Sequence, residues 1–529
     1  MKNQAKNYLV NLIIPAVVFA FVTGALTAIT ITLYKVCAKY VIGFSQACYG
    51  YLRTHLYFIP VILIVLVGIS FLFSFLYKKI PNLKGGGIPT TIGILRGIIT
   101  FKWLRNLLGV FITSLTTFLI GVPLGNEGPS VQMGTAIGRG SIYFAKKHRA
   151  WDRYTMTGGA CAGFAVATGA PVSGILFAIE EAHERISPMI VIVSSISVMV
   201  AYLISGVLAP VFNVSVLLFP KFEIATLSIA QVWIPLVVGV FSGLFAVIFL
   251  KYYKILFSFF DKKLKKIPHS IKIFAVLSLT LIAGLFSFSF ISTGHGLIEN
   301  LFSKNIAIYM LVLLLLVRST LTLIANSNSI TGGIFLPILA IGATFSTILA
   351  KGALALGLGE YYTAILAFGI TACIAGIMKM PITAIVFVIE TLSLYDNIIF
   401  VIIVSALSYA ITEIFGVKSI NEKVLDNRVK EFNQGKSVKV IDTFVTVQKN
   451  SFAIGKQIRD IFWPANLFVL SIKRNENSGA EVDEHGKKSI KEGDILHVRY
   501  STYDENQTRA ELKAIVGEQE YFEQEAEKV

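Results

Sequence analysis

The sequence predicts an all-α protein that crosses a membrane several times, followed by a small α+β domain. Hydrophobic residues make up 55% of the chain and charged residues only 15%, and the mean hydropathy is +0.71. A soluble protein could not bury so much apolar surface. The second observation is a repeat, because two segments far apart carry one pattern that ends on a glutamate. Together these observations predict a polytopic membrane protein built from two related halves.

The repeat is clearest in residues 171–180 and 381–390, which read PVSGILFAIE and PITAIVFVIE. Proline, isoleucine, phenylalanine, isoleucine and glutamate recur there in register. Upstream, Gly125-Asn-Glu-Gly-Pro129 aligns with Gly333-Ile-Phe-Leu-Pro337. In membrane proteins, two halves with matching glycine- and proline-interrupted segments point to a solute site at the midplane. We therefore expect the glycine-rich turns to form that site.

Seven apolar runs are near or above the ~20 residues that a bilayer requires. They are residues 9–33, 58–76, 189–212, 232–250, 273–291, 308–324 and 382–411. Three further runs, at residues 87–98, 107–122 and 334–349, are interrupted by glycine and proline. At membrane depth such interruptions survive only where the backbone is buried in protein or lines a cavity. We predict that these runs are re-entrant half-helices that meet inside the protein.

The formal net charge of +16 gathers in clusters such as residues 146–149 and 262–266. Basic loops of membrane proteins lie in the cytoplasm, so we interpret these clusters as cytoplasmic loops and expect no nucleic-acid partner. The lysines near the N-terminus favour a cytoplasmic start by the same rule. The four cysteines form no CxxC pair, which indicates neither a disulfide framework nor a metal site. No nucleophile–base constellation or phosphate loop appears, so we do not expect an enzyme.

From residue 436 the chain has the composition of a soluble domain, with charged residues throughout. We divide the chain into a transport domain, residues 1–428, and a C-terminal domain, residues 429–529. Short alternating apolar runs predict strands at residues 438–447, 467–472 and 495–500. Residues 453–461 are predicted to form a short helix that ends near Trp463 and the proline after it.

Three glycine-rich turns are predicted to expose helix N-termini. In Gly85-Gly-Gly-Ile-Pro89 the glycines free the backbone, and the proline suits a first helical turn. The second turn begins at Gly125 and the third at Thr331. A helix N-terminus offers unpaired N–H donors and about half a positive charge, so it attracts an anion. Three such ends could converge on one dehydrated anion; for the first turn the alternative is a cluster of helix-packing glycines.

Glu127 stands in the second turn, directly after the strongly apolar residues 110–122. An acid inside a membrane segment is a functional candidate, because its burial is costly. Ionised, it can imitate the anion, and protonated it can withdraw; the alternative is an ordinary first-turn acid stabilised by the helix dipole. Glu180 and Glu181 close a helix at the edge of the membrane and are further candidates; the alternative is simple solvation at a helix end. Arg318 lies in an apolar run and is expected to pair with carbonyls or a carboxylate.

The turns GGGIP at 85–89, GNEGP at 125–129 and GIFLP at 333–337 resemble, in order and spacing, the signature motifs of the CLC chloride channel and transporter family. Residues 170–181 are similar to the stretch of that family that carries an internal proton-path glutamate. The resemblance covers roughly residues 57–421. It implies a CLC-type inverted repeat of partly re-entrant helices and a homodimer in the lipid bilayer, with one anion pathway per subunit.

The resemblance also implies roles for single residues. Glu127 would be the external gating glutamate, and Glu181 the internal proton glutamate of members that exchange anions for protons. The anion would be held by residues of the three turns and of the helix after them: Gly86, Asn126, Glu127, Gly128, Ile334, Phe335, Leu336 and Asn421. Because both glutamates are present, we expect a Cl⁻/H⁺ antiporter whose partners are chloride or another small anion and protons; a passive gated chloride channel is the alternative.

The chain departs from the family pattern at three positions. Gly86 stands where serine is usual, Asn126 where arginine or lysine is usual, and Asn421 where a tyrosine hydroxyl usually contacts the anion. Fluoride-exporting members also depart from the usual pattern in the first two motifs, so a F⁻/H⁺ antiporter is a further alternative. Against fluoride stands Glu181, which we would not expect that branch to keep.

The C-terminal domain is similar to the C-terminal regulatory domain of TrkA/RCK potassium-transport proteins, on residues 454–460, 463–474 and 491–498. The resemblance implies a cytoplasmic sensor for a regulatory nucleotide, for example cyclic di-AMP, while transport itself requires no cofactor. The alternative is a domain that only strengthens dimerisation. For the whole chain we expect a bacterial, multi-pass cell-membrane protein with both termini in the cytoplasm.

Overall fold

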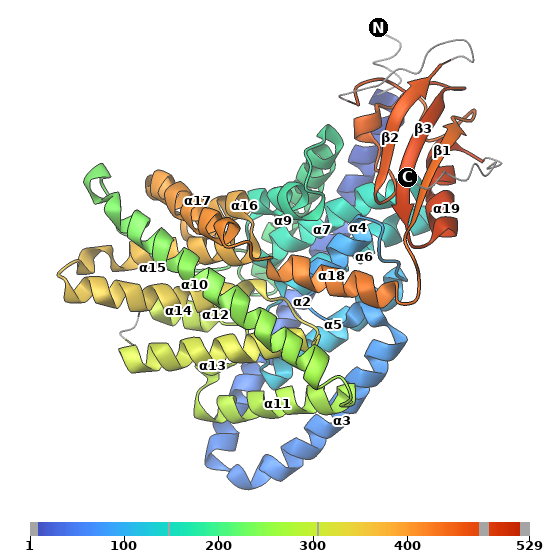
Figure 1. Ribbon diagram of the computed structural model, residues 1–529. Helices are drawn as coiled ribbons and strands as arrows, with labels where there is room; N and C mark the ends of the chain where they lie inside the picture. Colours follow the sequence, from blue (N-terminus) through green and yellow to red (C-terminus); the bar gives the residue numbers. More distant parts are fainter. Residues whose placement is uncertain (1–8, 146–148, 304–305, 475–485, 519–529) are drawn as a thin grey trace.

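The computed structural model describes residues 9–145, 149–303, 306–474 and 486–518. A helical body carries a small sheet domain at one end (Figure 1). Within these residues ten helices are long and apolar enough to cross a membrane, which confirms the predicted multi-pass membrane protein. Both chain ends and the basic residues 146–148 lie outside the described ranges, so the sidedness stays a prediction.

Within the residues that the structure describes, the α-helices of the body fall into two successive sets of eight, followed by one connecting helix. The first set is α2 (Ile14–Thr54), α3 (Ile59–Lys79), α4 (Ile88–Leu95), α5 (Trp103–Ile120), α6 (Glu127–Ala145), α7 (Asp152–Thr168), α8 (Pro171–Phe177) and α9 (Pro188–Val211). The second set is α10 (Trp233–Ser258), α11 (His269–Phe286), α12 (His295–Ser303), α13 (Ile308–Ser327), α14 (Phe335–Ala355), α15 (Tyr362–Cys373), α16 (Pro381–Leu392) and α17 (Ile398–Ile414). Helix α18 (Ile420–Phe432) then leads to the sheet domain.

Several predicted spans need correction. The first does not end at residue 33, because α2 continues through two lysines to Thr54. The run 382–411 is two helices, α16 and α17, separated at Ser393, whose φ is +59°. Of the three interrupted runs, only 87–98 gives a short helix; 107–122 and 334–349 belong to the full-length α5 and α14. The proline of the third turn sits in the first turn of α14, where its missing N–H leaves no hydrogen bond unmade.

Hydropathy does not identify helices α6 and α7 as buried elements, because glycine, alanine and serine residues lower it. A Cβ atom at Gly134 would overlap the carbonyl oxygen of Gly159, and one at Gly159 would overlap that of Gly134. The two backbones are therefore in direct contact, the packing that small residues give membrane helices. This packing fixes the start of α6 inside the protein.

The two halves are joined by a reciprocal pair of helix caps. Glu180 accepts hydrogen bonds from the amides of Ile382 and Thr383, at 2.9 and 2.7 Å, and from the Thr383 hydroxyl at 2.6 Å. Glu390 does the same at the start of α8, with two amides and one hydroxyl at 2.6–2.9 Å. The solvated helix end considered for Glu180 is thus wrong, because its carboxylate neutralises the exposed amides of the other half.

The C-terminal sheet has the strand order β1-β3-β2 and is antiparallel throughout. Its strands, β1 (Lys439–Thr446), β2 (Leu467–Lys473) and β3 (Ile495–Thr502), confirm the predicted ones, and α19 (Glu505–Val516) follows. The helix predicted at 453–461 is not formed: Gly455 has φ +77°, and only a 3₁₀ turn at Ile458–Asp460 remains. A left-handed glycine within the run stops a helix.

This domain contacts the body through the start of α7 and the segment that follows Glu181. Phe462 is 5% exposed and belongs to the core of the body. Its ring lies 4.4 Å from that of Tyr154 and stacks on His183 at 5.0 Å, both between ring centroids. Arg153 forms an ion pair with Glu511 at 2.5 Å. The domain is therefore anchored next to one of the predicted proton-path residues.

Candidate anion site

The structure brings the three glycine turns together. Gly125 and Gly333, which the repeat makes equivalent, exchange N–H···O bonds of 2.6 and 2.7 Å. The amide of Gly332 donates to Gly85 of the first turn at 3.3 Å. Turns that lie far apart in the sequence thus form one contiguous backbone cluster inside the body.

Glycine is required where the first two turns meet. A Cβ at Gly128 would overlap the carbonyl oxygen of Gly86, and a Cβ at Gly87 would overlap that of Gly128. Gly87 also has φ +77°, which side chains rarely tolerate. The close approach aims the start of α4 and the start of α6 at the same region.

The helices at these turns begin with amides that have no acceptor within the helix. The first internal bond of α6 is Ser130 N to Asn126 O, 3.0 Å, and that of α14 is Ile338 N to Ile334 O, 3.0 Å. The amides before Ser130 and Ile338 are free of helical partners by geometry and carry the positive end of the helix dipole. They include the predicted set Asn126, Glu127, Gly128, Ile334, Phe335 and Leu336. Such an arrangement is suited to a small anion.

Glu127 lies at the centre of this cluster and is 0% exposed. Among the described residues neither of its carboxylate oxygens has a hydrogen-bond partner. One oxygen occupies the space that a side chain at Gly125 would fill, close to Leu336. A buried, unpartnered carboxylate is costly, so this group is poised to bind a proton or to move.

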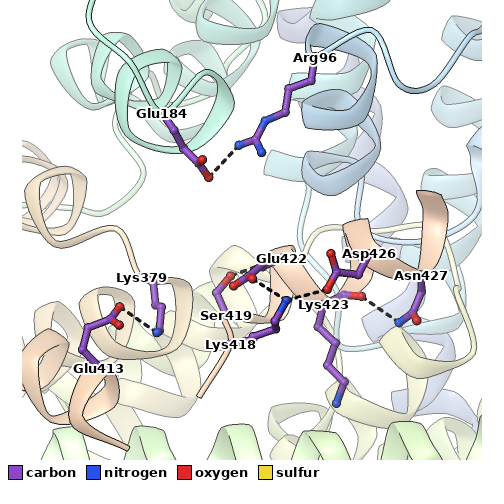
Figure 2. A network of polar contacts seen from close by, with 10 residues as sticks. All are labelled: Arg96, Glu184, Lys379, Glu413, Lys418, Ser419, Glu422, Lys423, Asp426 and Asn427. Atoms are coloured by element: carbon purple, nitrogen blue, oxygen red, sulfur yellow. Dashed lines mark hydrogen bonds and ion pairs between the residues drawn. The ribbon is translucent and has the colours of Figure 1, made fainter. Parts of the chain in front are cut away.

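Glu181 lies at the other end of the site, towards the C-terminal domain. Its carboxylate accepts a hydrogen bond from the amide nitrogen of Asn421 at 3.0 Å. Arg96, just after α4, donates to the backbone carbonyls of Glu181 and Ala182, at 3.1 and 3.0 Å, and pairs with Glu184 at 2.9 Å (Figure 2). The peptide that carries this glutamate is therefore clamped in place.

Asn421 is presented by the first turn of α18. Ser419 caps that helix by accepting from the amide of Glu422 at 3.0 Å, and Lys418 pairs with Glu422 and Asp426 at 2.8 and 2.9 Å (Figure 2). The side-chain amide predicted to donate to the anion is thus engaged with the Glu181 carboxylate.

Two polar residues of α13 complete the site. Asn326, which sequence reasoning missed, has its amide nitrogen 3.8 Å from the point a Cβ of Gly86 would occupy, and its oxygen accepts from the Tyr253 hydroxyl at 2.9 Å. An asparagine at the end of an apolar run was the available signal. Arg318 donates to three backbone carbonyls at 2.8–3.1 Å, which confirms the expected pairing with carbonyls.

A cavity of about 510 Å³ leads to the site, and Asn126 and Leu336 lie in its wall. It touches the start of α6 and, at Ala167, the end of α7. The C-terminal domain contacts the opposite end of α7, at Arg153 and Tyr154. The cavity therefore opens on the face of the body away from that domain.

These features define a polytopic membrane protein of two inverted halves whose helix ends meet around a central acid. Residues 69–413 match the sequence model of the family described as voltage gated chloride channel. The chain therefore belongs to this family, which is the CLC family that its motifs resemble.

The relatives share most of the chain. The H(+)/Cl(−) exchange transporters ClcA of Salmonella arizonae and Salmonella typhimurium are each 29% identical over 424 residues, covering 77% of this chain and 87% of the relative. A slow cyanobacterial Cl⁻/H⁺ antiporter has a similar structure, with a TM-score of 0.72, 24% identity and coverage of 79% of this chain and 99% of its own. The structure of a CLC-type fluoride/proton antiporter is also similar, with a TM-score of 0.63 and 20% identity. The match covers 76% of this chain and 96% of that protein. At these identities the structural likeness concerns the fold.

Proposed function

We propose that this protein exchanges chloride for protons across the membrane. The observation that carries the proposal is the buried Glu127 carboxylate, unpartnered among the described residues and set among helix-end amides suited to an anion. Glu181 supplies a second titratable group on the side of the C-terminal domain. The names of the ClcA relatives, H(+)/Cl(−) exchange transporters, support the same activity.

In this mechanism the ionised Glu127 competes with chloride for the amides of α6 and α14. Protonation removes its charge, so the carboxyl group withdraws and chloride enters. The proton then passes between Glu127 and Glu181, which exchanges protons with the aqueous phase beside the C-terminal domain. Because the amides carry only partial charges, the anion is bound weakly enough to leave.

Glu127→Gln tests the proposal in proteoliposomes loaded with chloride, with external pH recorded during efflux. We expect chloride efflux to persist without proton uptake, because the amide cannot carry a proton between the two sides. Glu413→Gln is the control, since that carboxylate pairs with Lys379 outside the site, and it should keep full coupling. Full, pH-dependent coupling in Glu127→Gln would refute the assignment, and chloride efflux without proton movement in the unaltered protein would identify a passive channel.

A fluoride/proton antiporter is the second candidate, favoured by the neutral Asn126 and by the missing hydroxyl at Gly86. The same vesicles loaded with fluoride test it. Coupled efflux of fluoride alone would replace chloride as the substrate.

We further propose a homodimer in a bacterial cell membrane, with both termini in the cytoplasm and the C-terminal domain acting as a regulator that binds a nucleotide such as cyclic di-AMP. The contact of Phe462 with His183, two residues from Glu181, supports regulation at the proton path. Calorimetric titration of the full-length protein with cyclic di-AMP tests the ligand, and absence of heat would exclude cyclic di-AMP as that ligand. Light scattering in detergent tests the dimer.

A further inference from the structure

The cavity that leads to Asn126 is positively charged. Its wall contains Lys35, Lys39 and Arg318, and no aspartate or glutamate is among the described residues that line it. A cavity lined by one sign of charge concentrates ions of the opposite sign. The helix end at its floor, however, carries the neutral Asn126 where the motif usually has a cation.

Lys35 is the cation best placed to attract an anion to the helix end at Asn126. It is half-buried on α2, and its ammonium group donates to the carbonyls of Val166 and Ser215, both at 3.0 Å. An ammonium group has three donors, so one remains for a ligand. Among the described residues Lys35 forms no ion pair, and no carboxylate shares the wall of the cavity with it. The charge is therefore fixed in position and available to an anion.

The other two cations are placed differently. Arg318 is 0% exposed and gives its two terminal nitrogens to backbone carbonyls, so it holds the loop between α11 and α12. Lys39, one helical turn beyond Lys35, is exposed and donates to the carbonyl of Asn213 at 2.5 Å. It lies on the rim, where water screens its charge.

We propose that Lys35 is the anion-capture residue of the cavity and supplies, from α2, the positive charge that the second motif lacks at Asn126. The proposal rests on the proposed function and names a further residue that binds the transported anion. A small inorganic anion entering the cavity meets the ammonium group of Lys35 before it reaches the amides of α6 and α14.

The test compares full-length variants in proteoliposomes, with initial chloride flux measured against chloride concentration at low and high ionic strength. Lys35→Gln keeps hydrogen-bond donors and loses the charge; we expect the half-saturating chloride concentration to rise about tenfold at low ionic strength and the difference to shrink at high ionic strength. Lys35→Arg should retain the affinity. Lys39→Met is the matched control and should stay within about twofold of the unaltered protein.

Adding Asn126→Lys to Lys35→Gln should restore the affinity, since it returns a charge to the same cavity. Unchanged affinity in Lys35→Gln, a loss independent of ionic strength, or failure of Asn126→Lys to restore affinity would each overturn the proposal. If Lys35 variants do not yield monodisperse protein, Asn126→Asp, an isosteric change at the floor of the cavity, decides. It places an opposing charge in the cavity, and unchanged affinity and salt dependence there would overturn the proposal.

Failure of the proposal for Lys35 can be distinguished from failure of the proposed chloride/proton exchange. Affinity for the anion can be measured whether or not protons are coupled to its flux. If the unaltered protein carried no anion, the proposed function would fail, and calorimetric titration with chloride in detergent would still compare Lys35→Gln with the unaltered protein.

Discussion

The two halves of the membrane body share their backbone scaffold and differ in their acids. Gly125 and Gly333 are equivalent and bond to each other, and the equivalent Glu180 and Glu390 each cap a helix of the opposite half. The residues that the two halves share therefore form the backbone framework of the site.

The equivalence breaks at two positions. Glu127 in the first half corresponds to Phe335 in the second, and Glu181 corresponds to Thr391. Phe335 is buried against two aromatic rings at 4.9 and 5.4 Å between centroids, whereas Glu127 has no hydrogen-bond partner among the described residues. One turn is thus held rigidly, while the other carries a group whose charge can change. A repeated scaffold thus acquires directional chemistry from side chains that are not repeated.

The largest effect is expected where the first half needs a glycine and the second does not. Gly128 corresponds to Leu336, and a Cβ at Gly128 would overlap the backbone of Gly86. We expect Gly128→Ala to destabilise the fold by more than about 3 kcal/mol and to abolish monodisperse protein on size exclusion. Gly206→Ala is the control, since a Cβ there meets nothing within 4 Å; it should be neutral or stabilising by up to about 1 kcal/mol. Equal behaviour of the two variants would contradict the close packing.

The second effect concerns the unrepeated acid near the C-terminal domain. Glu181→Gln should reduce proton uptake per chloride at least about tenfold, because a proton-transfer group is lost. Thr391→Val, at the equivalent position, should leave coupling unchanged, since among the described residues that hydroxyl bonds only the carbonyl of Phe387 within its helix, at 2.7 Å. Proteoliposome efflux with pH recording measures both, and loss of coupling in the valine variant would show that the two halves share the proton path.

The smallest effect tests the symmetric part. Glu180→Gln and Glu390→Gln should each lower the free energy of unfolding by about 1–3 kcal/mol, because each weakens charge-assisted bonds to helix-end amides. Thermal unfolding in detergent compares the two, with Glu413→Gln as a surface-pair control expected to change stability by less than about 1 kcal/mol. Markedly unequal shifts would mean that the two caps are not equivalent in energy.

Sequence reasoning worked where local rules suffice. Hydropathy located α3, α9, α10 and α13, and the glycine turns were recognised from their composition. Local patterns do not suffice where packing decides the outcome: the glycine in α5 and the proline in α14 predict interruptions that these helices do not have, and small residues conceal α6 and α7. The site residues in the turns are predictable because their signals lie in short motifs, whereas Lys35 lies beyond the predicted end of the first span, residue 33, where no local pattern marks it.

By itself the sequence determined the membrane class, the two halves, the three turns and the positions of both unrepeated acids, since these follow from composition and short-range pattern. Only the tertiary structure decided that Glu180 caps the helix at Ile382, that Asn421 bonds Glu181, and that Lys35 reaches the cavity beside Asn126. Each of these is a contact between segments far apart in the chain. Such contacts depend on how whole helices pack, and no local pattern encodes their outcome.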